Sequence, residues 1–181
     1  MSPKLAFSSH LIGLTIFASL LPVSTQTSVP AANDGVAIAT ADITAGILTY
    51  ARWPQPLRTV RLCIVGASAS STRITNRALV NGQALAVERM AVGNWTADRC
   101  DAIFLGRVTA AERTTIIRDI ANRPILSMTD NDPQCLYGSM FCLRGVAGGV
   151  TFDLNIDAVS RSRVRVDPRV LALARRPGGA R

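Results

Sequence analysis

The chain has 181 residues, a formal net charge of +8 at pH 7 and a single histidine, His10. His10 lies in an N-terminal segment that we expect to be removed, so the mature protein would have no histidine. This excludes Ser-His-Asp and Cys-His catalysis and histidine-ligated metal sites. Lys4 is the only lysine, and every other residue with a positive charge at pH 7 is an arginine. The positive charge favours binding to acidic proteins, anionic lipids or small anions. The alternative is a solvated basic face that keeps the protein in solution.

Residues 1–30 have the pattern of a cleavable signal peptide. Lys4 gives a positive start, and the apolar run at 11–21 is too short to span a bilayer. Cleavage is expected within residues 24–32, with an uncleaved N-terminal anchor as the alternative. Residues 31–181 would then form a single exported domain, and export argues against a nucleic-acid partner despite the positive charge.

The first part of this domain alternates helices with short apolar strands. Apolar residues at helical spacing predict a first helix, which Trp53-Pro54 ends because a residue before proline avoids helical angles. Thr109 and Glu112 form a capping box at the start of a later helix. In chain order we expect a helix over 36–51, a strand over 61–65, a weak helix over 72–80, strands over 85–90 and 102–105, a helix from 109 to before Pro124, and a strand over 125–128.

The C-terminal part predicts an antiparallel hairpin followed by a short helix. Residues 140–143 and 150–155 form the strands of the hairpin, and Gly148-Gly149 supplies the turn. Asp167 and Pro168 suit the N-cap and the first position of the closing helix. Together these elements predict an α/β fold: a three-layer sandwich in which a mixed, mostly parallel sheet is flanked by helices and carries the hairpin at one side.

The four cysteines, Cys63, Cys100, Cys135 and Cys142, form an even set, and an oxidising compartment favours disulfides over metal ligation. Three pairings are open. The most economical pairing joins Cys135 to Cys142 across a short loop and Cys63 to Cys100 between two predicted strands. Because the sequence has no C-x-x-C motif, neither a zinc site nor a thiol-disulfide oxidoreductase is favoured. A reversible, regulatory short-loop bond remains an alternative to a structural one.

No segment predicts catalytic residues, a metal site or a cofactor, and the ligand-binding residues stay unknown. Gly145–Gly149 lacks the lysine of a phosphate-binding loop and is explained by the hairpin. Gly66–Ser71 follows a strand, where α/β proteins often bind ligands, so a bound small anion there is an alternative. Trp53 is expected to pack where its helix meets the sheet, with a binding role as the alternative.

Arg161, Arg163 and Arg165 alternate with smaller residues, so they are expected to project from one side of an extended segment. As a solvated edge strand, they would deter unwanted strand pairing. As a docking patch, they would offer forked donors to the carboxylates or phosphates of a partner. The solvated edge is the favoured interpretation, and these arginines are the candidate partner-binding residues.

A series of short segments also carries a resemblance to a known family. In chain order they are Tyr50–Pro54, Leu62–Gly66, Cys100–Gly106, Ile125-Leu126, Cys135–Leu143, Val150–Asn155 and Val170–Arg175. Their order and the four cysteine positions together resemble the YfiR family of bacterial periplasmic regulators, over nearly the whole domain. The likeness is thinnest from Ala67 to Arg99, so no contact residue is carried over from that region.

The resemblance implies a non-enzymatic periplasmic repressor. Similar proteins bind the periplasmic part of an inner-membrane diguanylate cyclase (YfiN) and keep cyclic di-GMP and biofilm formation low. An outer-membrane OmpA-like lipoprotein (YfiB) can sequester the repressor. The resemblance also implies a homodimer and two intramolecular disulfides, Cys63–Cys100 and Cys135–Cys142, through which a redox response would act. The alternative function is a periplasmic small-ligand-binding sensor module.

Overall fold

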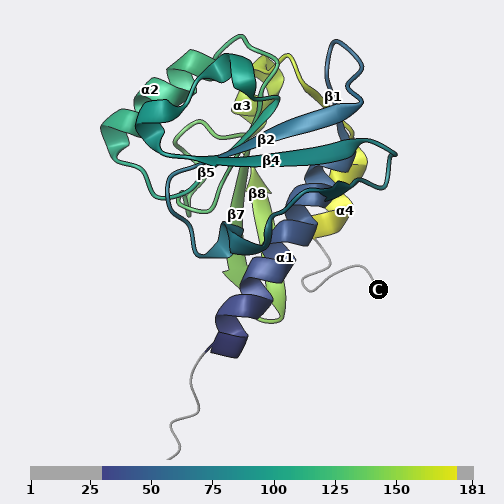
Figure 1. The fold of residues 1–181 in the computed structure, drawn as a ribbon, viewed down its shortest axis with the longest axis vertical. Coiled ribbons are helices and arrows are strands. Elements are labelled where there is room, and N and C mark those ends of the chain that lie inside the picture. The colour runs from purple at the N-terminus through teal and green to yellow at the C-terminus, as the bar shows by residue number, and fades with distance from the viewer. Residues whose placement is uncertain (1–29, 175–181) are drawn as a thin grey trace, which may run out of the picture.

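A seven-stranded sheet organises the fold (Figure 1). Its strands, in spatial order, are β3 (Arg77–Ala78), β4 (Ala84–Met90), β2 (Thr59–Val65), β5 (Ala102–Leu105), β6 (Leu126–Thr129), β7 (Phe141–Val146) and β8 (Gly149–Leu154). The five inner strands run parallel, and the two edge strands, β3 and β8, are antiparallel to their neighbours. The structure is a computed structural model that describes residues 30–174, so the predicted signal peptide lies outside the described residues, apart from Pro30.

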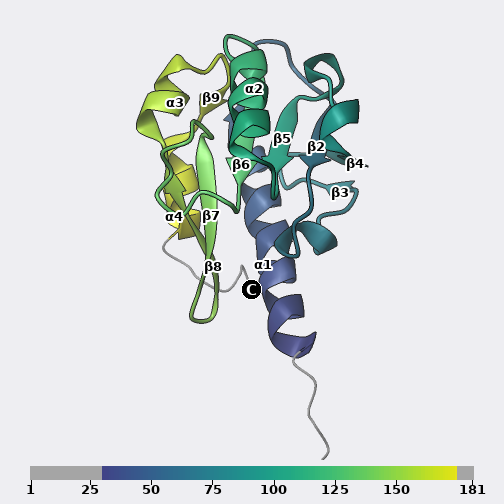
Figure 2. The same ribbon diagram turned by 90° about the vertical axis from the view of Figure 1, so that its left-hand side faces the viewer.

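Helices cover both faces of the sheet, as Figure 2 shows for α1 (Pro30–Thr49) and α2 (Ala110–Ile120). The core on one face joins Ile47 of α1 to Phe104 of the sheet, and α4 (Leu171–Ala174) packs against β8 on the same side. The core on the other face joins Ile116 of α2 to Ile103. Neighbouring strand residues thus point into opposite cores. The predicted three-layer α/β sandwich with a mostly parallel sheet is confirmed.

Local sequence signals account for the central elements. β5 has the predicted bounds and all four of its residues are buried, as expected for a strand covered on both faces. The capping box of α2 is confirmed: the Thr109 hydroxyl accepts a hydrogen bond from the Glu112 backbone N–H at 3.2 Å, and the Glu112 carboxylate accepts one from the Thr109 backbone N–H at 2.7 Å.

The predicted hairpin is also confirmed, with β7 and β8 paired antiparallel from Phe141↔Leu154 to Val146↔Gly149. Phe141 and Phe152 meet edge to face, with ring centroids 5.3 Å apart. β7 also pairs parallel with β6. The hairpin therefore extends the parallel sheet at one edge, where the sequence placed it.

A second, two-stranded sheet joins distant parts of the chain. β1 (Ala51–Arg52) pairs antiparallel with β9 (Arg165–Val166), with Ala51 opposite Val166 and Arg52 opposite Arg165. α1 therefore ends at Thr49, two residues before its predicted end, because the next residues are extended in β1. None of the helices within residues 30–174 is long and apolar enough to cross a membrane.

The predicted weak helix over 72–80 is wrong. In its place the chain forms the 3-10 turn η1 (Ser70–Arg73) and the short edge strand β3. The side chain of Asn76 accepts a hydrogen bond from the backbone N–H of Val87 at 2.7 Å, which draws this segment to the edge of β4. Two further 3-10 turns, η2 (Val92–Asn94) and η3 (Ala97–Arg99), then carry the chain from β4 to β5.

The helix α3 (Ile156–Arg161) was not predicted. It begins directly after β8, where the Asn155 side chain accepts a hydrogen bond from the Ala158 backbone N–H at 2.9 Å. The alternating pattern of residues 150–155 predicts Asn155 as a strand residue instead. The structure of the closing segment agrees better with its prediction. Asp167 caps the turn η4 (Pro168–Val170), which continues into α4.

Candidate functional site

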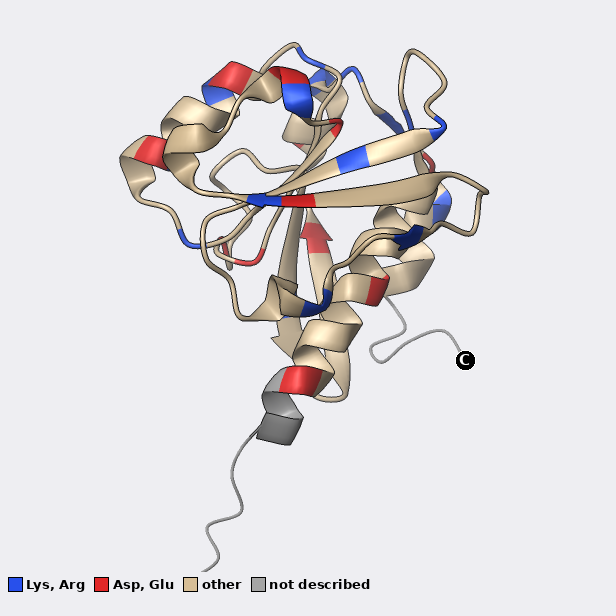
Figure 3. Ribbon diagram, viewed as in Figure 1, with Lys and Arg blue, Asp and Glu red and all other residues tan. Residues whose placement is uncertain are grey.

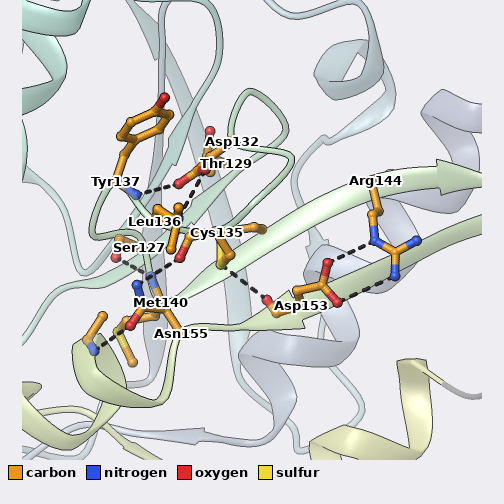
Figure 4. Close-up of a disulfide and its surroundings, with 12 residues drawn as sticks. Ser127, Thr129, Asp132, Cys135, Leu136, Tyr137, Met140, Arg144, Asp153 and Asn155 are labelled. Carbon is orange, nitrogen blue, oxygen red and sulfur yellow. Dashed lines mark hydrogen bonds and ion pairs between the residues drawn. A yellow bond between two sulfur atoms is a disulfide. The ribbon is translucent and has the colours of Figure 1, made fainter.

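A short disulfide loop before β7 presents apolar side chains to solvent in a fixed position. Cys135 and Cys142 are bonded, and we call residues 135–142, including both cysteines, the stapled loop. Asp132, which is buried, accepts hydrogen bonds from the backbone N–H groups of Leu136 at 3.1 Å and Tyr137 at 2.7 Å (Figure 4). One carboxylate therefore fixes the start of the loop, while the disulfide closes its two ends.

The backbone of the stapled loop depends on two residues in the left-handed region. Cys135 has φ +54° and Gly138 has φ +94°. The Cys135 carbonyl accepts a hydrogen bond from the Asn155 side chain at 3.0 Å, which ties the loop to the start of α3. A Cβ atom on Gly138 would lie 2.9 Å from Ile117 Cγ2, so only glycine lets the loop pack this closely against α2.

Two large apolar residues stand on the outer side of this rigid loop. Leu136 is 70% exposed and Tyr137 is 57% exposed. The guanidinium carbon of Arg113 in α2 lies 4.6 Å from the centroid of the Tyr137 ring, so a cation packs on one face of that ring. Ile156, the first residue of α3, is exposed as well. The exposed Leu-Tyr pair offers adjacent apolar surface on a fixed backbone, and tyrosine is a residue type enriched at protein interfaces.

No role for Leu136 or Tyr137 is predicted from the sequence. The available signal was the spacing: an Asx residue shortly before a short-spaced cysteine pair predicts a capped turn. Two adjacent large apolar residues in such a turn have no core to enter, so they are expected at the surface. That inference needs the disulfide pairing, which the sequence left open.

The second disulfide, Cys63–Cys100, is buried between the sheet and α2. Its Cα atoms lie 5.7 Å apart, as disulfide geometry requires. Both bonds match the most economical pairing, and the two disulfides of the predicted fold are present. All four cysteines are thus held in disulfides.

The three candidate arginines do not share one extended segment, so that expectation is wrong. Arg161 lies in the last turn of α3 and forms an ion pair with Asp157. Arg165 lies in β9 and is exposed, and Arg163, in the link between α3 and β9, lines a cavity beside Trp53. Figure 3 shows basic and acidic residues interspersed along the elements in view, rather than one continuous basic run.

The loop at Gly66–Ser71 is a poor anion site. The hydroxyl groups of Ser68 and Ser70 both donate to one carboxylate oxygen of Asp130, each at 2.5 Å. The Asp130 carboxylate therefore uses both hydroxyl donors and places a negative charge beside the loop, which disfavours a bound anion. Within residues 30–174, no group of three or more His, Cys, Asp or Glu side chains is placed to hold a metal ion.

Comparison with known protein families agrees with this architecture. The family model described as YfiR/HmsC-like matches residues 38–175, which reach from α1 past α4 and include both disulfides. The family is regulatory and non-catalytic, and it is associated with periplasmic control of a diguanylate cyclase. The buried disulfides suit an oxidising compartment of that kind. With a match over most of its length, the chain belongs to the YfiR/HmsC-like family.

Proposed function

We propose that this protein is a periplasmic, non-enzymatic regulator that binds the periplasmic part of an inner-membrane diguanylate cyclase (YfiN-like) and represses it. Cyclic di-GMP and biofilm formation would then stay low. Family membership supports the class of function. The observation that carries a docking role is the stapled loop, which holds Leu136 and Tyr137 exposed on a fixed backbone.

Preorganisation is the physical reason to place docking at this loop. A flexible loop loses conformational entropy when a partner orders it, at about 0.5–1.5 kcal/mol for each immobilised side chain. The disulfide and the Asp132 hydrogen bonds have already ordered this backbone. Tyr137 adds a large ring with one polar group, a residue type enriched among the few that dominate binding energy.

A genetic experiment tests the regulatory role. Deleting the gene should raise cyclic di-GMP and biofilm only while the cyclase gene is intact, and restoring the wild-type gene should reverse both. A deletion without effect on cyclic di-GMP would overturn the proposal. So would a rise of equal size in cells that lack the cyclase.

A binding experiment tests the docking surface. The variant Leu136→Asp/Tyr137→Ser should bind the purified periplasmic part of the cyclase more weakly by about 2 kcal/mol or more, roughly thirtyfold. The matched control is Val80→Asp. Val80 is 96% exposed in the turn between β3 and β4, at the opposite edge of the sheet. Equal losses in the two variants, or none in either, would contradict docking at the stapled loop.

We also propose a second partner, a homodimer and a redox response. An outer-membrane OmpA-like lipoprotein (YfiB-like) would sequester the repressor by competing for an overlapping surface, and the repressor would act as a homodimer. Reduction of a disulfide would weaken repression. Arg163 and Arg165, both exposed and without an acidic partner at ion-pair distance within residues 30–174, are more available to a partner than the paired Arg161.

A further inference from the structure

A cavity of about 320 Å³ lies at the amino-terminal ends of β5 and β6, far in the chain from the stapled loop. Its lining combines one aromatic residue, several apolar ones and a set of charged groups. They include Trp53, Leu57, Ile125, Arg61, Asp101 and Arg163. The volume is at the lower end of the range for small-molecule sites, so a ligand of modest size would fill it.

The two-stranded sheet explains why Trp53 and Arg163 line the same cavity. Ala51 is opposite Val166 and Arg52 is opposite Arg165 in β1 and β9. Trp53 directly follows β1 and Arg163 lies shortly before β9, so in this antiparallel pair both residues fall at the same end of the small sheet. Two residues far apart in the sequence therefore line one cavity.

The ring of Trp53 is fixed in the wall of the cavity. Its indole N–H donates a hydrogen bond to the backbone carbonyl of Asp101 at 3.0 Å. With its polar atom satisfied, the rest of the ring is left as apolar surface, and Leu57 and Ile125 add to that surface. The wall therefore suits a flat or branched apolar group.

The charged groups of the cavity leave one cation without a partner. Arg61 binds the Asp101 carboxylate through two side-chain hydrogen bonds, at 3.0 and 2.8 Å, and Arg123 is paired with Asp98. No acidic side chain within residues 30–174 lies at ion-pair distance from Arg163. An unpaired guanidinium beside a neutral, partly apolar wall attracts an anion, and its forked donors match a carboxylate.

We propose that this cavity binds a small monocarboxylate with an apolar body, whose carboxylate pairs with Arg163 while its body packs against Trp53 and Leu57. The site is distinct from the stapled loop, and it assigns Trp53 and Arg163 a shared role in binding. A monocarboxylate fits better than phosphate because only one cation is unpaired and most of the remaining wall is apolar.

Probe ligands test the chemical class. Benzoate should bind the purified wild-type protein in calorimetric titration. Benzamide, which has the same shape without the charge, and inorganic phosphate, which has charge without an apolar body, should each bind at least about tenfold more weakly, which corresponds to about 1.4 kcal/mol. No binding of benzoate overturns the proposal. Benzamide or phosphate binding as tightly as benzoate overturns it too.

Variants test the location, and the arginine run supplies matched controls. Arg163→Gln should weaken benzoate binding by about tenfold or more, because a hydrogen-bonded charge pair is lost. Arg165→Gln, two residues away in β9, should leave the affinity within about twofold, since only a more distant, screened charge changes. Equal losses in both variants would show a general charge effect and overturn the site. All these arginines are exposed, so both variants should fold.

Nuclear magnetic resonance gives a readout that does not depend on an arginine variant. The protein has two tryptophans, Trp53 and Trp95, and Trp95→Phe assigns their indole N–H signals. Benzoate should shift the Trp53 signal and leave the Trp95 signal in place. A shift confined to Trp95, or no shift of either signal at saturating benzoate, would overturn the proposal.

Discussion

Three hydrogen bonds join Arg61 of β2 to the carboxylate of Asp101, the residue directly before β5. The Asp101 carboxylate accepts hydrogen bonds from the Arg61 guanidinium at 3.0 and 2.8 Å and from the Arg61 backbone N–H at 2.9 Å. The Asp101 carbonyl also accepts from Trp53 and from the backbone N–H of Leu126. One residue therefore ties together β2, β6 and the segment after β1, at the end of the sheet where β5 begins.

We predict that Asp101→Ala lowers the free energy of unfolding by about 2–3 kcal/mol, because it leaves a backbone donor and part of a guanidinium without partners. The Asp101 side chain is only 12% exposed, so water replaces those bonds poorly. Arg118 and Asp119 provide the control, since their contact at 4.0 Å is exposed. Asp119→Ala should change stability by less than about 0.5 kcal/mol in urea unfolding. Similar losses in the two variants would contradict this assignment.

The elements that could be predicted from the sequence are those whose causes are local. β5 is a short apolar run followed by a glycine, and α2 begins with its own capping box. The predictions of both elements were therefore correct. The hairpin was correct because Gly148-Gly149 and the alternation after it lie within one stretch of chain. In each case, the residues that predict the element lie within one short, continuous stretch of the chain.

The elements that could not be predicted depend on distant partners. β3 forms because Asn76 and the edge of β4 offer it hydrogen bonds, and the sequence of 72–80 alone favours a helix equally well. β1 and β9 are two residues each and exist only as a pair. The cavity beside Trp53 could not be predicted from the sequence either, because its lining depends on the pairing of β1 with β9. The exposed position of the stapled loop could not be predicted, because the sequence left three cysteine pairings open.

Gly66 permits a close approach between the loops after β2 and β5. It has φ +81°, and a Cβ atom there would lie 2.7 Å from the Arg107 carbonyl oxygen. We predict that Gly66→Ala costs about 2–4 kcal/mol, which combines left-handed strain with overpacking. Gly82 has a similar φ of +85° with nothing within 4 Å, so Gly82→Ala should cost only about 1 kcal/mol. Equal urea midpoints for the two variants would show that the close approach has no energetic consequence.

Asp167 is expected to make stability depend on pH in the acid range. Its carboxylate accepts hydrogen bonds from the side chain and the backbone N–H of Arg169, and these lower the pKa of Asp167 from 3.8 to about 2. Because the folded pKa is depressed, the ionised carboxylate stabilises the fold above about pH 4, and this stabilisation is lost as the pH falls towards about 2.

The variant Asp167→Asn tests this dependence, since asparagine still caps the turn but does not ionise. The urea midpoint of the wild-type protein should fall more steeply between about pH 4 and pH 2 than that of the variant, and high salt should narrow the difference. The hydrogen bonds from Thr109 also lower the pKa of Glu112, but Glu112 titrates in both proteins and cancels in the comparison. Parallel pH profiles would contradict a contribution from Asp167.

The two disulfides should differ in what they contribute to stability. Cys63 and Cys100 are 37 residues apart, whereas Cys135 and Cys142 are only 7 apart. A bond that closes a longer loop removes more entropy from the unfolded chain. The double serine variant at 63 and 100 should therefore lose about 4 kcal/mol of unfolding free energy, and the double serine variant at 135 and 142 about 2.5 kcal/mol.

Substituting both partners of each bond leaves no unpaired thiol from that bond to react. Asp132 and Asn155 still hold the stapled loop when its bond is absent, which keeps the second loss small. Unfolding in urea measures both losses under oxidising conditions. Equal losses, or a larger loss for the short loop, would mean that strain or residual structure in the unfolded chain outweighs loop closure.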